Sequence, residues 1–288
     1  MKFLLGIFLV CLQITARAEV AVNDDDGRRL SLSSPAKRVI SLAPHITELL
    51  YAAGGGQAVV ASVEYANYPE AAKALPRVGT YSAFDLERIA SLKPDLLVVW
   101  GSGNPPGQVA QLRRLGIPIF ISEPRQLSDV PSSLRRLGQL LGTEKAAGQA
   151  AGQFEQRLAA LRQRYAGKRE VSVFYEIWNQ PLMTVGGDHI ISAVIGLCGG
   201  RNVFAGIGQP ASAVGVESVL RANPEAIVAS GMGEERPDWL DDWKRWKTLN
   251  AVERGHLFFV PPDLLQRHTP RILEGAEQLC TALDKVRQ

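Results

Sequence analysis

A short pattern that occurs twice in this 288-residue chain constrains its fold more than any other feature. The first copy covers residues 86–103 and the second covers residues 216–233. In each copy a glutamate, Glu87 or Glu217, opens a helical segment, a proline follows seven residues later, and an apolar run ends in Gly-x-Gly. The pattern predicts a helix, a proline turn and a strand with a glycine-rich exit. Its repetition predicts two lobes of similar construction.

Apolar runs and helical patterns alternate on both sides of one long helical stretch. Strands are expected at residues 38–42, 58–63, 96–100, 117–121, 171–177, 226–229 and 257–260, and helices at 46–53, 85–92 and 190–197. Residues 143–166 contain no proline and predict a single helix of roughly 35 Å. Alternating strands and helices are typical of parallel sheets. We therefore predict an α/β fold with two Rossmann-like lobes, residues 37–142 and 167–288, with mostly parallel central sheets and with the helix 143–166 joining them.

The first eighteen residues have the pattern of a cleavable export signal. Lys2 precedes a short apolar run over residues 3–12, and residues 16–18 provide the small residues of a cleavage site. The apolar run is too short to span a bilayer. We therefore predict that residues 1–18 are a signal peptide and that the mature protein is periplasmic.

The cysteine content agrees with export. Cleavage would remove Cys11 and leave Cys198 and Cys280. An even pair in an oxidising compartment is typical of a disulfide, although two buried thiols would also satisfy the sequence. There is no Cys-x-x-Cys, so neither redox catalysis nor a zinc knuckle is supported.

Charge and motif content argue against several classes of function. The chain carries 32 basic and 29 acidic residues, without the concentrated basic surface that nucleic-acid binding needs. It contains no Gly-x-Ser-x-Gly and no His-Glu-x-x-His, so we do not expect an enzyme. Its four histidines, His45, His189, His256 and His268, form no His-rich loop, so a metal-ion site is not expected.

Several aromatic residues follow the expected strands. Tyr65, Tyr68 and Tyr81 lie in loops of the first half, Trp100 ends a strand, and Trp178 follows the strand that opens the second half. Each of them alone could equally be a packing residue. In open α/β sheets, however, ligands bind beyond the carboxyl ends of the strands. Flat rings with polar tips at that place suit a large, planar, partly polar ligand between two lobes.

Five segments carry a resemblance to a known family: RVISLAPHITELLYAAG, VEYANYPEAA, RVGTYSAFDLERIASLKPDLLVVWGSGN, PLMTVGGDHIISAVIGLCGGRNVF and PPDLLQRHTPRILEGAEQLC. Over about residues 38–283 the chain resembles the periplasmic vitamin B12-binding proteins of ABC importers, which belong to the helical-backbone (class III) solute-binding proteins. The resemblance implies a monomer that captures cobalamin or a related corrinoid in the inter-lobe cleft. It would deliver this ligand to the permease and ATPase subunits of an importer. Cobalamin is then a transported ligand, and no resident cofactor or metal is expected.

The resemblance also assigns residues to the cleft. Two departures affect the choice of cargo, since Met183 replaces an aromatic residue and residues 209–212 lack an expected tryptophan. Cys198 and Cys280 match the disulfide positions of the family. The residues implied to line the cleft are Pro44, Tyr65, Tyr81 and Trp100 from the first lobe, and Met183, Asp263 and Arg267 from the second.

Two acidic residues match positions that dock onto the permease. Glu87 and Glu217 correspond to a pair of acidic residues, one per lobe, that contact permease arginines in the family. They also occupy equivalent places in the internal repeat. A carboxylate in the first turn of a helix is, however, favoured by the helix dipole alone.

Three alternatives remain open from the sequence. His45 could be an axial ligand of cobalt or a polar residue at a helix start. The loop 263–271 could contact the ligand, or it could be a salt-bridged loop that closes onto the C-terminal helix. Haem or a ferric siderophore is the alternative cargo, and for haem Tyr65, Tyr81 or His45 is available as an axial ligand.

Overall fold

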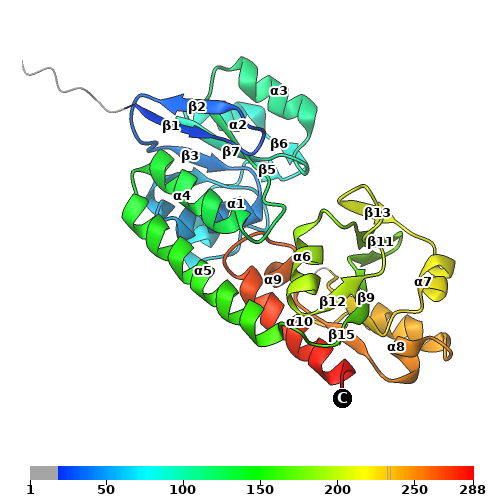
Figure 1. Ribbon diagram of the computed structural model, residues 1–288. Coiled ribbons are helices and arrows are strands. Elements are labelled where there is room, and N and C mark those ends of the chain that lie inside the picture. The colour runs from blue at the N-terminus through cyan, green and yellow to red at the C-terminus, as the bar shows by residue number, and fades with distance from the viewer. Residues whose placement is uncertain (1–18, 232, 234) are drawn as a thin grey trace, which may run out of the picture.

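The protein is described by a computed structural model that covers residues 19–231, 233 and 235–288. The expected signal peptide, residues 1–18, lies outside the described residues. Two lobes lie side by side and are bridged by one long helix (Figure 1). In the described part of the chain, no helix combines the length and the apolar character needed to cross a membrane.

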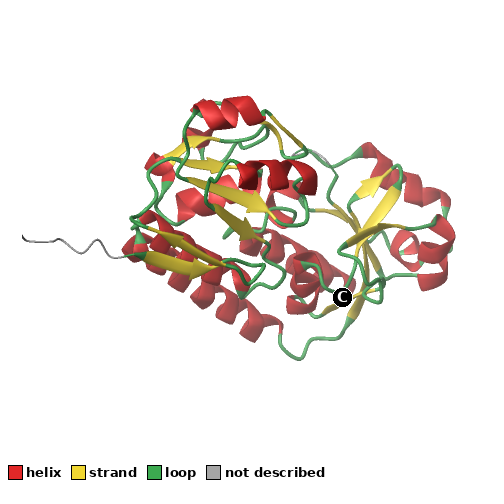
Figure 2. Cartoon of the chain, turned by 90° about the horizontal axis from the view of Figure 1, so that it is seen from above, coloured by secondary structure: helices red, strands yellow, loops and turns green. Residues whose placement is uncertain are grey.

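The first lobe is built on a four-stranded parallel sheet with the order β4-β3-β7-β8. Short, mostly buried strands form it because their apolar runs are covered on both faces, as in other α/β sheets. Helices α1, α4 and α5 pack on one face, and α2 and α3 pack on the other. Figure 2 shows helices on both sides of this sheet. The elements are β3 (Val39–Ser41), α1 (Pro44–Ala52), β4 (Val59–Ala61), α2 (Leu86–Ser91), β7 (Leu96–Trp100), α3 (Pro106–Arg114), β8 (Ile119–Ser122) and α4 (Asp129–Leu141), with short pieces η1 (Gly56–Ala58), η2 (Glu70–Ala74), β5 (Gly79–Thr80) and β6 (Ala83–Phe84).

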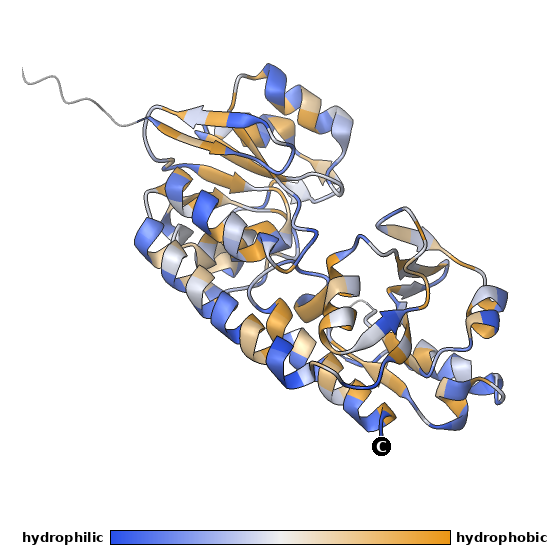
Figure 3. Ribbon diagram, in the orientation of Figure 1, coloured by the Kyte–Doolittle hydropathy of each residue, from blue (hydrophilic) through white to orange (hydrophobic). Residues whose placement is uncertain are grey.

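The second lobe repeats this architecture with a parallel sheet of order β12-β9-β14-β15. A small antiparallel sheet, β10-β11-β13, is added beside it. The strands of the two parallel sheets are largely hydrophobic (Figure 3). The elements are β9 (Val171–Glu176), β10 (Trp178–Asn179), β11 (Leu182–Val185), α6 (Ile190–Leu197), β12 (Gly200–Asn202), β13 (Ala211–Ala213), α7 (Val216–Ala222), β14 (Ala226–Ala229), η3 (Asp238–Arg245), α8 (Asn250–Glu253), β15 (Leu257–Phe259), α9 (Pro262–Leu265) and α10 (Ile272–Val286).

The long helix expected between the lobes is α5, Glu144–Tyr165. It begins directly after the Gly142–Thr143 turn, where Gly142 ends α4 with a φ of 67°, a left-handed conformation that favours glycine. Phe154, Leu158 and Leu161 on its buried face pack toward the cores of both lobes. The predicted α/β class, with two parallel-sheet lobes and one helix between them, is confirmed.

One hydrophobic core extends through both lobes. It includes Val39 of the first sheet, Phe154 of α5, and Val173 of the second sheet. Each lobe has one further hydrophobic cluster, on the face of its sheet that points away from this shared core. Because a shared core continues from one lobe to the other, the lobes are not separate hydrophobic units.

An antiparallel hairpin, β1 (Val20–Asn23) and β2 (Arg29–Leu32), was not predicted. It precedes residue 37, where we expected the first lobe to begin, and it packs on α4. The Arg136 guanidinium on α4 pairs with the Asp25 carboxylate of the hairpin turn at 2.6 Å. The hairpin therefore belongs to the first lobe.

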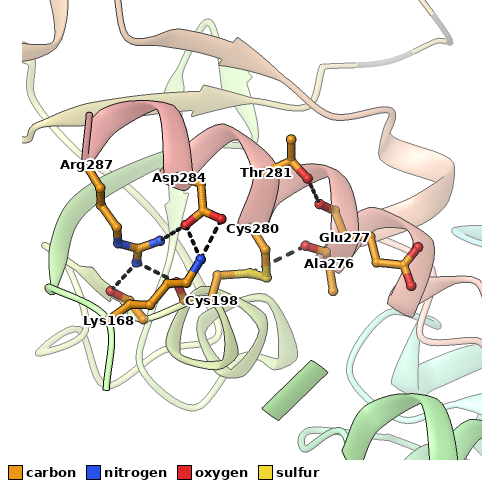
Figure 4. The surroundings of a disulfide bond; sticks show 9 residues. Lys168, Cys198, Ala276, Glu277, Cys280, Thr281, Asp284 and Arg287 are labelled. Atoms are coloured by element: carbon orange, nitrogen blue, oxygen red, sulfur yellow. Dashed lines mark hydrogen bonds and ion pairs between the residues drawn. A yellow bond between two sulfur atoms is a disulfide. The ribbon is translucent and has the colours of Figure 1, made fainter. Parts of the chain in front are cut away.

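A disulfide joins Cys198, at the end of α6, to Cys280 on α10. Figure 4 shows the bond beside the ion pair between Lys168 and Asp284, which Arg287 extends. Both cysteines are fully buried. Of the two states that the sequence allowed, the structure contains the disulfide, which fastens the C-terminal helix to the second lobe.

Candidate ligand-binding cleft

A cavity of about 420 Å³ lies between the lobes. It opens beyond the carboxyl ends of β7, β8 and β9, the place where α/β sheets bind ligands. Much of its wall is apolar, while its polar groups come from both lobes. The lining includes Trp100, Ser102, Glu123, Pro124 and Arg125 from the first lobe, and Ile177, Asp188, His189, Ile190, Pro210 and His268 from the second.

The indole of Trp100 is held in place by its neighbours in the first lobe. The Asn104 side chain accepts a hydrogen bond from the Trp100 backbone N–H at 2.7 Å, and its amide donates to the carbonyl oxygens of Leu42 and Tyr81. Any side chain at Gly103 would overlap the Trp100 ring. The buried amide of Asn104 therefore fixes the wall of the cleft, a role that nothing in the sequence had indicated.

Three imidazoles meet behind and beside this wall. The ring of His268 lies between the other two, with centroids 5.6 Å from His45 and 5.5 Å from His189. His45 also packs edge-on against Trp100 at 5.1 Å. His45 and His268 are only 4% and 5% exposed. His45 and the loop that contains His268 were candidates for ligand contact from the sequence, whereas His189 was not. The meeting of the three rings was not predicted, because they lie far apart along the chain.

Burial keeps these imidazoles neutral. It lowers the pKa of His45 to about 3, with a further contribution from the positive charge of Arg267. Burial likewise lowers the pKa of His189 to about 4 and that of His268 well below its ordinary value. At neutral pH the cluster therefore presents uncharged nitrogens rather than cations.

A buried ion-pair cluster joins the two lobes next to the imidazoles. The Glu48 carboxylate on α1, 3% exposed, accepts hydrogen bonds from Arg267 at 2.7 Å, from Thr269 at 3.1 Å and from Arg271 at 2.9 and 3.0 Å. Arg267 also pairs with Asp263 at 2.8 Å. The loop 263–271 is thus salt-bridged, as one of the two readings allowed, but its partner is α1 and not the C-terminal helix.

The same cluster reaches the aromatic loop of the first lobe. Arg267 donates to the Asn67 side chain at 2.7 Å and to the Tyr65 carbonyl oxygen at 3.2 Å. The Arg271 guanidinium lies 3.9 Å from the centroid of the Tyr68 ring. The side chain of Tyr65 itself is 72% exposed, and its φ of 64° turns the loop sharply.

The eight residues predicted for the ligand are therefore distributed over three places. Trp100 lines the cavity, and His45 and Tyr81 contact Trp100. Tyr65, Asp263 and Arg267 form one group at the ion-pair cluster. Pro44 opens α1 and Met183 lies on β11, and neither of them lines the cavity.

The two glutamates predicted for docking lie on separate lobes. Glu87 and Glu217 are exposed in the first turns of α2 and α7. Neither forms an ion pair with another residue that the structure describes. Among residues 19–231, 233 and 235–288, no group of three His, Cys, Asp or Glu side chains is placed to hold a metal ion.

Comparison with known proteins connects this geometry to a family. A family model described as "Periplasmic binding protein" matches residues 39–264. The vitamin B12-binding protein of Vibrio cholerae is 38% identical over 250 residues, which cover 86% of this chain and 90% of the relative.

Solved structures agree with that assignment. The crystal structure of the periplasmic vitamin B12 binding protein of Vibrio cholerae has a TM-score of 0.82 and 37% identity, and covers 88% of this chain and 99% of its own. The periplasmic heme-binding protein RhuT from Roseiflexus has a TM-score of 0.77 and 26% identity, with 88% and 100% coverage. These relatives are solute-binding proteins and not enzymes. With the family model, the sequence relative and the fold all in agreement, this chain belongs to the periplasmic binding protein family.

Proposed function

We propose that this protein captures cobalamin or a related corrinoid in the cleft between its lobes and delivers it to an ABC importer. The observation that carries the proposal is the cleft itself, in which Trp100 and the apolar residues opposite it form facing walls. Flat apolar walls with polar groups at the rim suit a macrocycle with a broad apolar face and polar substituents. The sequence relatives that match most of the chain are named vitamin B12-binding proteins.

The rim of the cleft supports this choice of ligand. Ser102 is held by Glu123, whose carboxylate accepts from the Ser102 backbone at 2.7 Å and from its hydroxyl at 2.9 Å. Asp188 and Arg125 line the same cavity from opposite lobes. Such mixed polar groups suit the amide substituents around a corrin ring.

A second candidate cargo is haem. Neutral imidazoles lie at the floor of the cleft, and imidazole is a common axial ligand of haem iron. A haem-binding structure shares the fold at 26% identity, compared with 37% for the vitamin B12-binding structure. The higher identity favours the corrinoid.

Calorimetric titration of the purified protein with cyanocobalamin, and separately with hemin, tests the proposal. We expect saturable one-to-one binding of cyanocobalamin and at most weak binding of hemin. Binding of hemin without binding of cyanocobalamin would keep the transport role and transfer the cargo to haem. Binding of neither ligand would overturn the proposal.

The remaining steps follow from the same proposal. Residues 1–18 direct the chain to the periplasm and are removed, and the mature protein acts as a monomer. The loaded protein docks through Glu87 and Glu217 onto a permease that is powered by ATPase subunits. Support comes from the exposure of both glutamates and from their equivalent places in the two lobes.

A further inference from the structure

Unsatisfied buried polar atoms gather at the floor of the cleft. His45 Nε2, Trp100 Nε1 and His268 Nδ1 are buried and have no hydrogen-bond partner among the described residues. In folded proteins most buried polar atoms are paired, and those that are not require an explanation. Their concentration around one cavity points to a ligand-binding function for this place.

The two histidines that carry orphan atoms have no contact at those atoms that would fix their tautomers. Their rings are neighbours, with centroids 5.6 Å apart. In neutral imidazole one nitrogen carries a proton and the other a lone pair. Neither His268 Nδ1 nor His45 Nε2 has a hydrogen-bond partner among the described residues, so a ligand can select the tautomer of His268 in which the lone pair is on Nε2. Since the ring of His268 lines the cavity and its Nδ1 is buried, Nε2 is the nitrogen that faces a ligand.

His189 has the opposite arrangement. Its Nδ1 accepts a hydrogen bond from the Ile191 backbone N–H at 3.1 Å, so in the neutral ring Nε2 must carry the proton. His189 can donate a hydrogen bond into the cleft, but it cannot offer a lone pair at Nε2 without losing its bond at the start of α6. Of the two imidazoles that line the cavity, His268 is therefore the one with an available lone pair.

The cluster does not suit a bare metal ion, because the described residues contain no group of three suitable donors. A metal that is already held by a macrocycle has a different requirement, since one axial donor is sufficient. An imidazole nitrogen is a suitable donor for cobalt and iron.

We propose that His268 provides an axial nitrogen to the metal centre of a macrocyclic cargo. This inference rests on the proposed function and names the form of ligand that the cleft prefers. The His268 nitrogen forms a bond to the metal and one axial water leaves, without transfer of an electron. The cleft should therefore prefer corrinoids with an exchangeable axial ligand over those whose axial positions are blocked.

The spectroscopic test uses cob(II)inamide, which lacks an intramolecular base. Its electron paramagnetic resonance spectrum is recorded in the presence of the protein, with histidine of natural abundance and with ¹⁵N-histidine. We expect a triplet superhyperfine splitting from one axial ¹⁴N that becomes a doublet with ¹⁵N. His268→Gln should abolish the splitting, whereas His256→Gln, which changes a histidine outside the cleft, should leave it intact.

A binding measurement provides the second readout. We expect the wild-type protein to bind aquacobalamin at least about tenfold more tightly than methylcobalamin, a difference of roughly 1.4 kcal/mol. This preference should disappear in His268→Gln and in His268→Ala and persist in His256→Gln. Circular dichroism confirms that each variant is folded.

The outcomes separate the inference from the proposed function. Tight binding of both cobalamins without nitrogen splitting and without preference would leave the proposed function intact and overturn the role of His268. Splitting that survives in His268→Gln but is lost in His45→Gln would overturn the role of His268 and assign the axial nitrogen to His45. Binding of no corrinoid at all would overturn both.

Discussion

At the residue scale, Glu176 is the acidic side chain whose environment differs most from water. It ends β9 and is 1% exposed, and its Oε2 accepts a hydrogen bond from Trp243 Nε1 at 2.7 Å. Burial raises the pKa of this carboxyl group to about 7, and the nearby charge of Asp242 adds to the rise. Below that pH the folded protein therefore holds Glu176 protonated.

The raised pKa of Glu176 makes the free energy of unfolding depend on pH. In the unfolded chain the Glu176 carboxyl group titrates near 4.5, so between pH 4.5 and 7 the folded state binds the proton that the unfolded state has lost. The contribution of Glu176 is thus fully present below pH 4.5 and is lost as the pH rises through 7. We expect Glu176→Gln to be more stable than the wild type at pH 8, by up to about 3 kcal/mol, and nearly equal to it at pH 4.5. Urea unfolding of the variant and of the wild type at pH 4.5 and pH 8 measures the two differences.

The buried imidazoles affect stability at acid pH, in the opposite direction to Glu176. The pKa values of His45 and His189 are lowered in the fold, so their contribution is fully present above pH 6.5 and is lost as the pH falls toward 4 and 3. The Glu176→Gln substitution should leave this acid-side loss unchanged. A difference between variant and wild type that is constant from pH 4.5 to 8 would contradict the assignment of the raised pKa to Glu176.

At the scale of elements, all strands of the two parallel sheets except β12 were predicted, together with the long helix α5, whereas the helix α4 was not. The strands β7, β9 and β14 are apolar runs with nearby proline, glycine or charged residues, and α5 is a long segment without proline. The helix α3 was missed because only Val109 and Leu112 of its nine residues are buried, which is too little for a clear pattern. The strands of the hairpin β1–β2 are four residues each, too short to show an alternation.

The cleft could be predicted only where its residues follow a strand. Trp100 ends β7, and its place at a strand exit indicated its role. The contacts among His45, His189 and His268, and the links of Asn104 to Leu42 and Tyr81, join segments distant in sequence. Local patterns do not contain such pairings, because they are set by how the two lobes pack.

The ion-pair cluster of Glu48 joins α1 to the loop before α10 and leads to a prediction about stability. Replacement of Glu48 with Gln removes the charge that compensates Arg267 and Arg271, both of which are largely buried. Loss of one member of a buried ion pair costs about 3–5 kcal/mol. We therefore expect Glu48→Gln to lower the free energy of unfolding by a few kcal/mol, measured with urea.

The matched control for this prediction is Glu155→Gln. Glu155 forms a two-point ion pair with Arg135 on the exposed faces of α4 and α5. Exposed pairs contribute about 1 kcal/mol or less. Equal losses in Glu48→Gln and Glu155→Gln would show that the buried cluster does not hold the lobes together.

At the scale of the whole molecule, three features limit the relative movement of the lobes. The hydrophobic core is continuous across them, α5 bridges them, and the Glu48 cluster joins α1 to the loop before α10. A flexible hinge normally concentrates its change in a few residues between separate cores. Ligand capture should therefore involve only a small movement, which small-angle X-ray scattering with and without cyanocobalamin can detect.

Docking is the function that requires both lobes at once. The double variant Glu87→Ala and Glu217→Ala should bind cyanocobalamin with nearly unchanged affinity, because both side chains are exposed and absent from the cavity lining. Uptake by cells or by permease-containing vesicles should be abolished. The control replaces Glu70 and Glu253, one exposed glutamate in each lobe, and should retain uptake. Loss of affinity in the first double variant would contradict a role confined to docking.

The Glu48 cluster also determines when the first lobe can be completed. Glu48 and Arg267 are separated by 219 positions, and Arg271 lies still farther along the chain. A protein is synthesised from its amino end, so a buried carboxylate of the first lobe exists long before the guanidinium groups that neutralise it. The first lobe cannot reach its final packing until the last turns of the chain have been made. Premature termination before residue 267 should therefore damage the amino-terminal half of the molecule as well as the end that is missing.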